Sequence, residues 1–515
     1  MNAKIVSNLQ KMIDVNTPII YINDYDFVRI DELIEQAIDK KKVYEWNPAT
    51  GGTHFVSKEK QGEDSLEKFL YQQYNVDADH SPECFLLLKE IEDFIEDPKV
   101  KSLLMHIAQR KLYDYTFNTT IIIVSTIVKV PQAIEKYVSF LDIDLPNEEE
   151  IEALIRKHVE VNHDEEGFNE KDIIPKLMPS LKGLTAFEID RTLDMAMSSN
   201  GTLRADDKTM IDQQKKQMVR QSGILELIDA NEQLEDIGGM DVLKRYLEAK
   251  AKVMEQADIQ KYGVQMPKGV FIVGMPGCGK SLCAKASAAA FKANLLKLDM
   301  GSMMGKYVGE SEGNLRKAIK VAEAAATCIL WIDEIEKAFS GVGGQNNDIV
   351  TRMFGYLLGW LQDKKSRVYV IATANNADNL PPELKRKGRF DEIFCVNLPT
   401  DKERKAIFEV HLNKKAKAEN VSLDDVDYDK LAEATKGFNG ADIEAVVNET
   451  TEHEFLRLLQ TKKDEKEKLT EKLIITTEKL IQEANKTVSI SKSCKEQIEN
   501  MRKIFKESNF KNASE

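Results

Sequence analysis

The sequence lacks the marks of disulfide-bonded, zinc-binding and membrane-spanning proteins. Its six cysteines form no C-x-x-C pair and its seven histidines are scattered, so neither a disulfide framework nor a zinc site is indicated. The longest apolar run, Thr120 to Val128, is too short to cross a bilayer, and the first residues contain no apolar core of a signal peptide. We therefore expect a soluble, cytoplasmic protein in a reducing compartment, with no membrane partner.

Positive charge is also in short supply. The chain carries 72 lysines and arginines against 86 aspartates and glutamates, a net charge of −14. This balance argues against general affinity for nucleic acid or for anionic membranes, so nucleic acid is an unlikely partner. With 515 residues, of which 42% are hydrophobic, the chain can form about two to four domains with a core each.

What the sequence does contain is a glycine-rich stretch, KGVFIVGMPGCGKS, between an apolar run and a helical pattern. It fits the P-loop pattern G-x-x-x-x-G-K-[ST], in which glycines let backbone N–H groups surround phosphate oxygens. Lys280 can reach the β- and γ-phosphates of ATP, and the Ser281 hydroxyl can bind Mg²⁺. The loop residues that we expect to bind ATP are Gly274, Met275, Pro276, Gly277, Cys278, Gly279, Lys280, Ser281 and Leu282.

A second apolar run, Cys328 to Ile332, ends in the two carboxylates Asp333 and Glu334. Placing paired acids at the end of a buried strand is costly unless a cation lies there. We expect Asp333 to hold Mg²⁺ through water and Glu334 to polarise the attacking water. Together the two stretches predict a nucleotide hydrolase of the α/β fold class.

The first half of the chain has the alternation of strands and helices that is typical of α/β folds. The predicted strands are Ile19–Ile22, Val43–Trp46, Cys84–Leu88 and Thr120–Ser125, and the predicted helices include Val28–Ile38 and Asp97–Gln109. Three stretches parallel the second half in the same order: CFLLLKEIEDF with CILWIDEIEKA, DIDLPNEEE with CVNLPTDKE, and KGLTAFEIDRTLDMA with KGFNGADIEAVVNET. The parallel predicts a second copy of the ATPase fold.

This copy lacks the residues that hydrolysis requires. At the P-loop position the chain has Asn23, Asp24, Tyr25 and Asp26, with no glycine or lysine and with two acids that would repel phosphate. Lys89 replaces the aspartate that would hold magnesium, although Glu90 remains. We predict a structural or recognition domain that does not hydrolyse ATP.

From about Leu234 to Glu449 the chain resembles ATPases of the AAA clade within the AAA+ superfamily. LEDIGG resembles the segment whose backbone contacts adenine, which implies that role for Ile237 and Gly238. GKYVGESEGNLRKA resembles the first pore loop, which implies that Tyr307 and Val308 contact a polypeptide substrate.

Two further motifs extend the resemblance. IATANNADNLPPELKRKGRFDEIF resembles the second region of homology, which implies that Asn375 is the sensor of water and γ-phosphate. The same motif implies that Arg386 and Arg389 reach the nucleotide of a neighbouring subunit. GFNGADI resembles the lid motif, which implies that Gly440 and Ala441 lie near the ribose and phosphates.

Over the whole chain the resemblance is to uncharacterised AAA proteins of plastid and bacterial genomes that pair a P-loop-less first domain with this ATPase domain. It is carried by LPPELKRKGRFDEIF, by TVSISKSCKEQIENMRKIF and by the closing NAS. In a plastid the compartment would be the stroma. The domains we expect are a degenerate AAA-like α/β domain (1–200), a linker (201–235), a P-loop α/β domain with a parallel sheet (236–399), and a helical lid with C-terminal helices (400–515).

The resemblance implies Mg²⁺-dependent ATP hydrolysis by a homo-oligomer, most simply a hexamer. Three function classes follow: a remodeller of an unknown protein substrate, an ATP-gated switch or scaffold acting through the first domain, and a nucleic-acid motor. The acidic charge disfavours the third. GWLQDKKSRVYV lacks the Asp-Gly-Phe motif of many AAA unfoldases, and Lys387 replaces a proline that is common between their two arginines. These departures keep the ATP-gated switch as an alternative to the remodeller.

Overall fold

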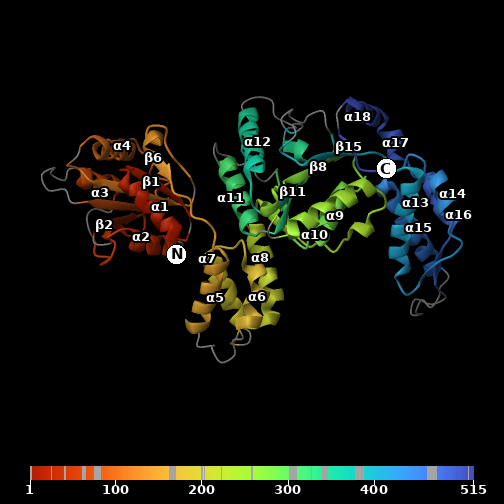
Figure 1. Cartoon of the computed structure of the whole chain (residues 1–515), viewed down its shortest axis with the longest axis horizontal. Coiled ribbons are helices and arrows are strands. Elements are labelled where there is room, and N and C mark those ends of the chain that lie inside the picture. Colours follow the sequence, from red (N-terminus) through yellow and green to blue (C-terminus); the bar gives the residue numbers. More distant parts are fainter. Residues whose placement is uncertain are drawn as a thin grey trace. The chain divides into compact units, whose positions relative to one another are not determined.

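The computed structural model is shown in Figure 1. It describes residues 3–24, 26–39, 42–60, 65–74, 83–114, 116–126, 128–161, 170–198, 201, 203–221, 223–256, 259–300, 310–325, 327–338, 346–376, 384, 388–460, 472–507 and 510–515. Residues 1–215 belong to a first compact unit, and a second unit, which begins at Lys216, contains most of the later residues. Among these described residues, no helix has the length and apolarity needed to cross a bilayer.

The first unit is built on a six-stranded sheet with the order β3-β2-β4-β5-β1-β6. Neighbouring strands are parallel except for the hairpin of β2 and β3. The central strands are continuous apolar runs because helices cover both faces of a parallel sheet. The strands are β1 (Ile19–Asn23), β2 (Val43–Asn47), β3 (Gly51–His54), β4 (Cys84–Lys89), β5 (Thr119–Ser125) and β6 (Val138–Phe140).

Alternate residues of these strands enter two different cores. Ile20 and Ile22 face one core with α1 (Ala3–Asp14) and α2 (Phe27–Ala37), whereas Ile19 and Tyr21 face the other. The second core contains side chains of α3 (Leu66–Tyr74) and α4 (Pro98–Tyr113). A group of helices follows the sheet: α5 (Glu148–Val161), α6 (Glu170–Leu181) and α7 (Ala186–Ser198).

The segment 201–235 differs from the predicted linker. It forms helix α8 (Lys208–Gln221) and strand β7 (Leu225–Ile228), and the boundary between the two units falls inside the helix. Lys215 is buried and its Nζ donates to the carbonyl of Pro179, 3.3 Å away. A few buried side chains, such as Ile211, anchor this regular structure, which the polar composition of the segment did not indicate.

The second unit contains a seven-stranded sheet with the order β15-β12-β8-β11-β10-β9-β7. Only β7 pairs antiparallel, against β9. The five inner strands, β12-β8-β11-β10-β9, repeat the order β6-β1-β5-β4-β2 of the first unit. The strands are β8 (Gly269–Gly274), β9 (Asn294–Leu298), β10 (Cys328–Ile332), β11 (Val368–Ala374), β12 (Glu392–Val396) and β15 (Lys511–Asn512).

Helices surround this sheet and form a lid after it. Those belonging to the sheet are α9 (Asp241–Glu255), α10 (Lys280–Ala290), α11 (Glu310–Ala324) and α12 (Asn346–Asp363). The lid helices, which cluster in Figure 1, are α13 (Asp401–Ala416), α14 (Tyr428–Ala434), α15 (Gly440–Gln460) and α16 (Thr477–Lys486). The parallel sheet and lid confirm the predicted fold class.

The C-terminal region is not wholly helical as predicted. A two-stranded ribbon of β13 (Val421–Leu423) and β14 (Leu473–Ile475) lies within the lid. After α17 (Ile490–Ser493) and α18 (Lys495–Glu507) the chain returns as β15 to the edge of the main sheet. The carbonyl of Ala513 accepts hydrogen bonds from Val242 N and Leu243 N, both 3.1 Å away, in the first turn of α9. The last residues are therefore part of the second unit.

Candidate nucleotide site

The glycine-rich loop connects β8 to the start of α10. Gly277 and Gly279 have φ angles of 73° and 82°, in the region that favours glycine. A Cβ on Gly277 would also lie 2.4 Å from the Asn439 side chain, so a larger residue there is excluded. Burial raises the pKa of Cys278 to about 11, which keeps this thiol neutral beside a site predicted to hold phosphates.

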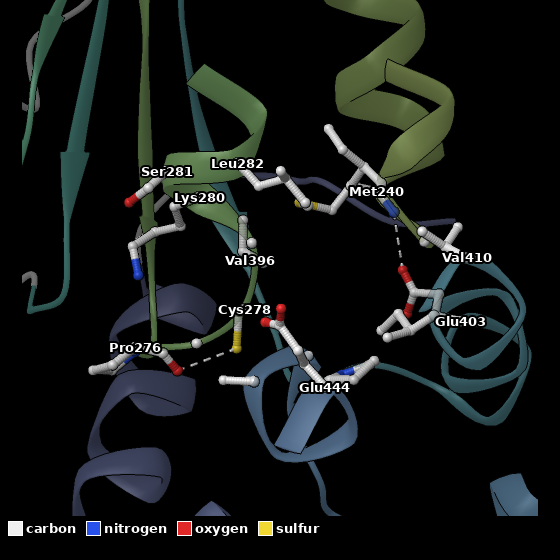
Figure 2. A pocket seen from close by; sticks show the side chains of 18 of the residues that line it. Met240, Pro276, Cys278, Lys280, Ser281, Leu282, Val396, Glu403, Val410 and Glu444 are labelled. Atoms are coloured by element: carbon white, nitrogen blue, oxygen red, sulfur yellow. Dashed lines mark hydrogen bonds between the residues drawn. The ribbon is translucent and has the colours of Figure 1, made fainter. Parts of the chain in front are cut away.

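Lys280 is buried at the beginning of α10, where Figure 2 shows it beside Ser281. Its Nζ donates to the carbonyls of Gly274 (2.7 Å) and Met275 (2.8 Å) and to Asn375 Oδ1 (2.8 Å). Burial lowers the pKa of Lys280, while neighbouring acidic groups act in the opposite direction. The ammonium thus has neutral partners that it can exchange for phosphate oxygens.

The two strand-end carboxylates lie where predicted, at the end of β10. Asp333 Oδ1 accepts a hydrogen bond from the Thr373 hydroxyl (2.7 Å), and Asp333 Oδ2 lies 3.1 Å from Lys297 Nζ. Glu334 Oε1 accepts from Asn375 Nδ2 at 2.7 Å. The backbone of Glu334 has a φ of 49°, which a non-glycine residue rarely adopts and which is found at functional sites.

Two residues that the sequence analysis missed support this arrangement. Buried Glu336 accepts a hydrogen bond from the backbone N–H of Asn375 (2.9 Å), and Thr373 also accepts one from the backbone N–H of Glu334 (3.2 Å). Both stand close in sequence to predicted site residues. The sequence motifs around Glu334 and Asn375 could have drawn attention to these two positions. Their hydrogen-bond partners could not be predicted, because each lies at the end of the neighbouring strand.

A cavity of about 570 Å³ lies beside these residues, within the usual size of a small-molecule site. Figure 2 shows its wall of P-loop, lid and the segment before α9. The hydroxyl-bearing Ser281 and the carboxylates Asp333 and Glu334 line it together. The predicted residues in its lining are Ile237, Gly238, Pro276, Gly277, Cys278, Gly279, Lys280, Ser281, Leu282, Asp333, Glu334, Asn375, Gly440 and Ala441.

The lid reaches the P-loop directly. The N–H of Ala441 donates to the carbonyl of Gly277 (3.1 Å), and Asn439 Nδ2 donates to the carbonyl of Pro276 (2.9 Å). Gly440 also has no room for a side chain without tight contact, since a Cβ would lie 3.1 Å from the carbonyl of Gly277. A movement of the lid would therefore change hydrogen bonds to the glycine-rich loop.

The segment predicted to contact adenine is held from far along the chain. Glu403 Oε1 on α13 accepts hydrogen bonds from Met240 N (3.2 Å) and from the hydroxyl of Ser514 (2.5 Å), and Figure 2 shows Met240 facing Glu403. Burial favours the neutral acid, but hydrogen bonds from Ser514, Thr400 and Met240 outweigh it and lower the pKa of Glu403. Sequence reasoning missed both Glu403 and Ser514, because no local motif marks them.

Some predicted residues are not brought to this cavity. Arg389 is described but does not line it. Arg386 and the pore-loop residues Tyr307 and Val308 lie outside the described residues.

The first unit carries a carboxylate at the matching helix start. Buried Asp26 caps α2 by accepting a hydrogen bond from Arg29 N (3.1 Å), and the Asp24 side chain accepts from Asp26 N (3.0 Å). The N-terminus of a helix favours an anion, and here the protein supplies its own. Glu90 has a φ of 55°, close to that of Glu334, so the strand-end turn of the ATPase unit is repeated.

Comparisons with known proteins agree with the geometry of the second unit. Residues 270–398 match the family model described as ATPase family associated with various cellular activities (AAA), and residues 425–468 match the AAA+ lid domain. Residues 5–143 and 149–222 match the N-terminal and second domains of SpoVK-like AAA ATPases.

Full-length relatives show the same similarity. The chain is 34% identical to the uncharacterized AAA domain-containing protein ycf46 of Guillardia theta, over 86% of each chain. It is 31% identical to the protein of the same name from Pyropia yezoensis, over 98% of this chain and 99% of that one. The Cell division cycle protein 48 homolog of Archaeoglobus fulgidus is 38% identical over 44% of this chain and 31% of its own length.

Replacing Ser514 tests the tie between the C-terminus and the cavity. Ser514→Ala removes a hydrogen bond to a charged group, so we expect the KM for ATP to rise about fivefold with little change in kcat. The control is Arg245→Ala, which breaks the exposed pair of Arg245 with Glu515 in the same tail. Steady-state kinetics of both variants check this, and an equal KM for the two variants would refute the tie.

Proposed function

The chain belongs to the AAA ATPase family, among the AAA domain-containing proteins named ycf46, and on this premise we propose that it is an oligomeric, Mg²⁺-dependent remodeller of a protein substrate. It is an ATPase, as its AAA domain establishes. The magnesium, the oligomer, the substrate and a location in the cytoplasm or plastid stroma belong to the proposal.

The observation that supports the reaction most strongly is the meeting of four functional groups. The Lys280 ammonium and the Glu334 carboxylate are both hydrogen-bonded to the side chain of Asn375, and Asp333 lines the same cavity. Phosphoryl transfer needs mainly positioning and neutralisation of charge, which these groups supply. Glu334 is held where it can orient a water for attack, and Lys280 can move from loop carbonyls to phosphate oxygens.

The donors at the cavity suit magnesium. The Ser281 hydroxyl and the Asp333 carboxylate are hard oxygen ligands, the type that Mg²⁺ takes beside phosphates. Mg²⁺ bound by Ser281, and through water by Asp333, would neutralise charge on the β- and γ-phosphates. Ile237 and Gly238 would hold the base on the wall that Glu403 braces.

Arg386 and Arg389 would complete the site from a neighbouring subunit, and a closed ring, a hexamer by analogy with the AAA family, would supply them to every subunit. The first unit would then be a recognition or scaffold domain. Its matching helix start is already capped by the carboxylate of Asp26, which takes the place that an anionic phosphate would occupy.

The alternative is an ATP-gated switch that assembles partners through the first unit. The absence of the Asp-Gly-Phe motif supports this alternative, because in AAA unfoldases that motif is associated with stepping coupled to ATP hydrolysis. Both proposals share the hydrolysis residues and differ in what the pore loop does.

Hydrolysis is tested by two substitutions. Lys280→Ala removes the main charge that answers the phosphates and should abolish ATP binding, whereas Glu334→Gln should bind ATP and hydrolyse it at least about a hundredfold more slowly. Equilibrium dialysis with labelled ATP should find one nucleotide per wild-type chain and none in Lys280→Ala. More than one nucleotide per wild-type chain, with one retained in Lys280→Ala, would indicate a second site in the first unit and contradict its assigned role.

Mixing of subunits tests the arginines. The double variant Arg386→Ala/Arg389→Ala should lose about 10²- to 10³-fold in turnover with nearly unchanged ATP affinity, because the lost charges act in the transition state. Added Lys280→Ala subunits have intact arginines and should restore part of the activity. An absence of recovery at every ratio would indicate a site complete within one chain.

Tyr307 distinguishes the remodeller from the switch. Tyr307→Ala should leave basal ATPase activity and oligomer size unchanged but abolish the stimulation of ATPase by substrate captured with Glu334→Gln. Tyr262→Ala, which removes an 84% exposed tyrosine of the second unit, is the control. If Tyr307→Ala retains full stimulation, the pore-loop role is wrong and the switch is favoured.

A further inference from the structure

The aspartate proposed to hold magnesium is paired with a lysine in the described site. Lys297 Nζ lies 3.1 Å from Asp333 Oδ2 and 4.6 Å from the centre of the Trp331 ring. Lys297 is the register partner of Trp331 on the adjacent parallel strand, and Asp333 follows Trp331 two residues later, directly after the end of β10. The ammonium is therefore held by a carboxylate and an aromatic face together.

The first unit has the same pair with the charges exchanged. Glu45 on β2 is the register partner of Leu87 on β4, and Lys89 follows two residues later. The parallel of CFLLLKE with CILWIDE matches Leu87 to Trp331 and Lys89 to Asp333, so Glu45 corresponds to Lys297. Lys89 Nζ lies 3.6 Å from Glu45 Oε1 and 2.8 Å from Asp31 Oδ1.

The two pairs differ in how far water reaches them. The side chains of Lys89 and Glu45 are 9% and 7% exposed, whereas those of Lys297 and Asp333 are 31% and 19% exposed. The Lys89–Glu45 pair is buried, and its charges balance each other because buried charges must be paired. The pair in the ATPase unit stands open to the cavity that Asp333 lines, so a second cation can approach this carboxylate.

We propose that Lys297 is a positioning residue that occupies Asp333 before Mg²⁺ arrives and thereby sets the Mg²⁺ concentration that the site requires. This inference rests on the proposed binding of Mg²⁺ at Asp333. Asp333 Oδ1 accepts a hydrogen bond from Thr373 and Oδ2 faces Lys297, so both oxygens already have a partner and a cation bound through water would compete with the ammonium or lie close beside it. Like charges repel, so Lys297 lowers the affinity for Mg²⁺. The pair also keeps Asp333 from standing as an unpaired carboxylate when the metal is absent.

The test measures Mg²⁺ binding directly. MgCl₂ is titrated by calorimetry into full-length Glu334→Gln protein saturated with ATP, so that no nucleotide is consumed. When Lys297→Met, which keeps the length of the side chain, is combined with Glu334→Gln, the Kd for Mg²⁺ should fall about tenfold. Lys297→Arg in the same background should leave the Kd near its starting value. Lys292→Met is the matched control, because it removes an exposed lysine that pairs with Glu255 near the same strand.

A spectroscopic measurement accompanies the titration. If Mg²⁺ displaces Lys297 from the ring of Trp331, the tryptophan emission should change on adding Mg²⁺ to the ATP-bound protein and should not change in Lys297→Met. If the Lys297→Met protein still binds ATP in EDTA but its Kd for Mg²⁺ is unchanged or raised, the inference about Lys297 is wrong, while the proposed function stands. Failure of the starting Glu334→Gln protein to bind ATP would instead overturn the proposed function.

Discussion

The arrangement of the proposed catalytic groups depends on one side-chain amide, that of Asn375. Its Oδ1 accepts from Lys280 and its Nδ2 donates to Glu334, so the group that we propose binds phosphate and the group that we propose orients water share one planar unit. An amide has a distinct donor end and acceptor end, and the two charged partners determine which end faces which. Because Glu336 also holds the backbone N–H of Asn375, the position of the amide is set by β11 and by the turn after β10 together.

A second constraint comes from the parallel sheets. Strands buried on both faces have to be apolar, so their polar groups concentrate at the carboxyl ends, where neighbouring strands meet. Both units obey this rule with the same strand order, but they use the edge differently. In the second unit the P-loop and an open Lys297–Asp333 pair leave room for ligands, whereas in the first unit Asp26 and a sealed Lys89–Glu45 pair satisfy the edge internally.

The site is also tied to the end of the chain. Ser514 and Met240 bind the same oxygen of Glu403, and the carbonyl of Ala513 caps the first turn of α9. The wall proposed for the base thus joins three segments that are far apart in sequence. Folding of the tail onto β12 therefore contributes to the cavity as well as to the sheet.

Local residue patterns were enough to predict the P-loop, the strand-end carboxylates and the fold class, because each depends on spacing within a few residues of one strand, turn or helix. They did not indicate the helix and the strand within residues 201–235, where a few buried side chains outweigh a polar average. Tertiary structure alone decided that Lys297 faces Asp333 and that Ser514 reaches Glu403. Such contacts arise from strand register and from the return of a distant segment, and no short stretch of sequence encodes either.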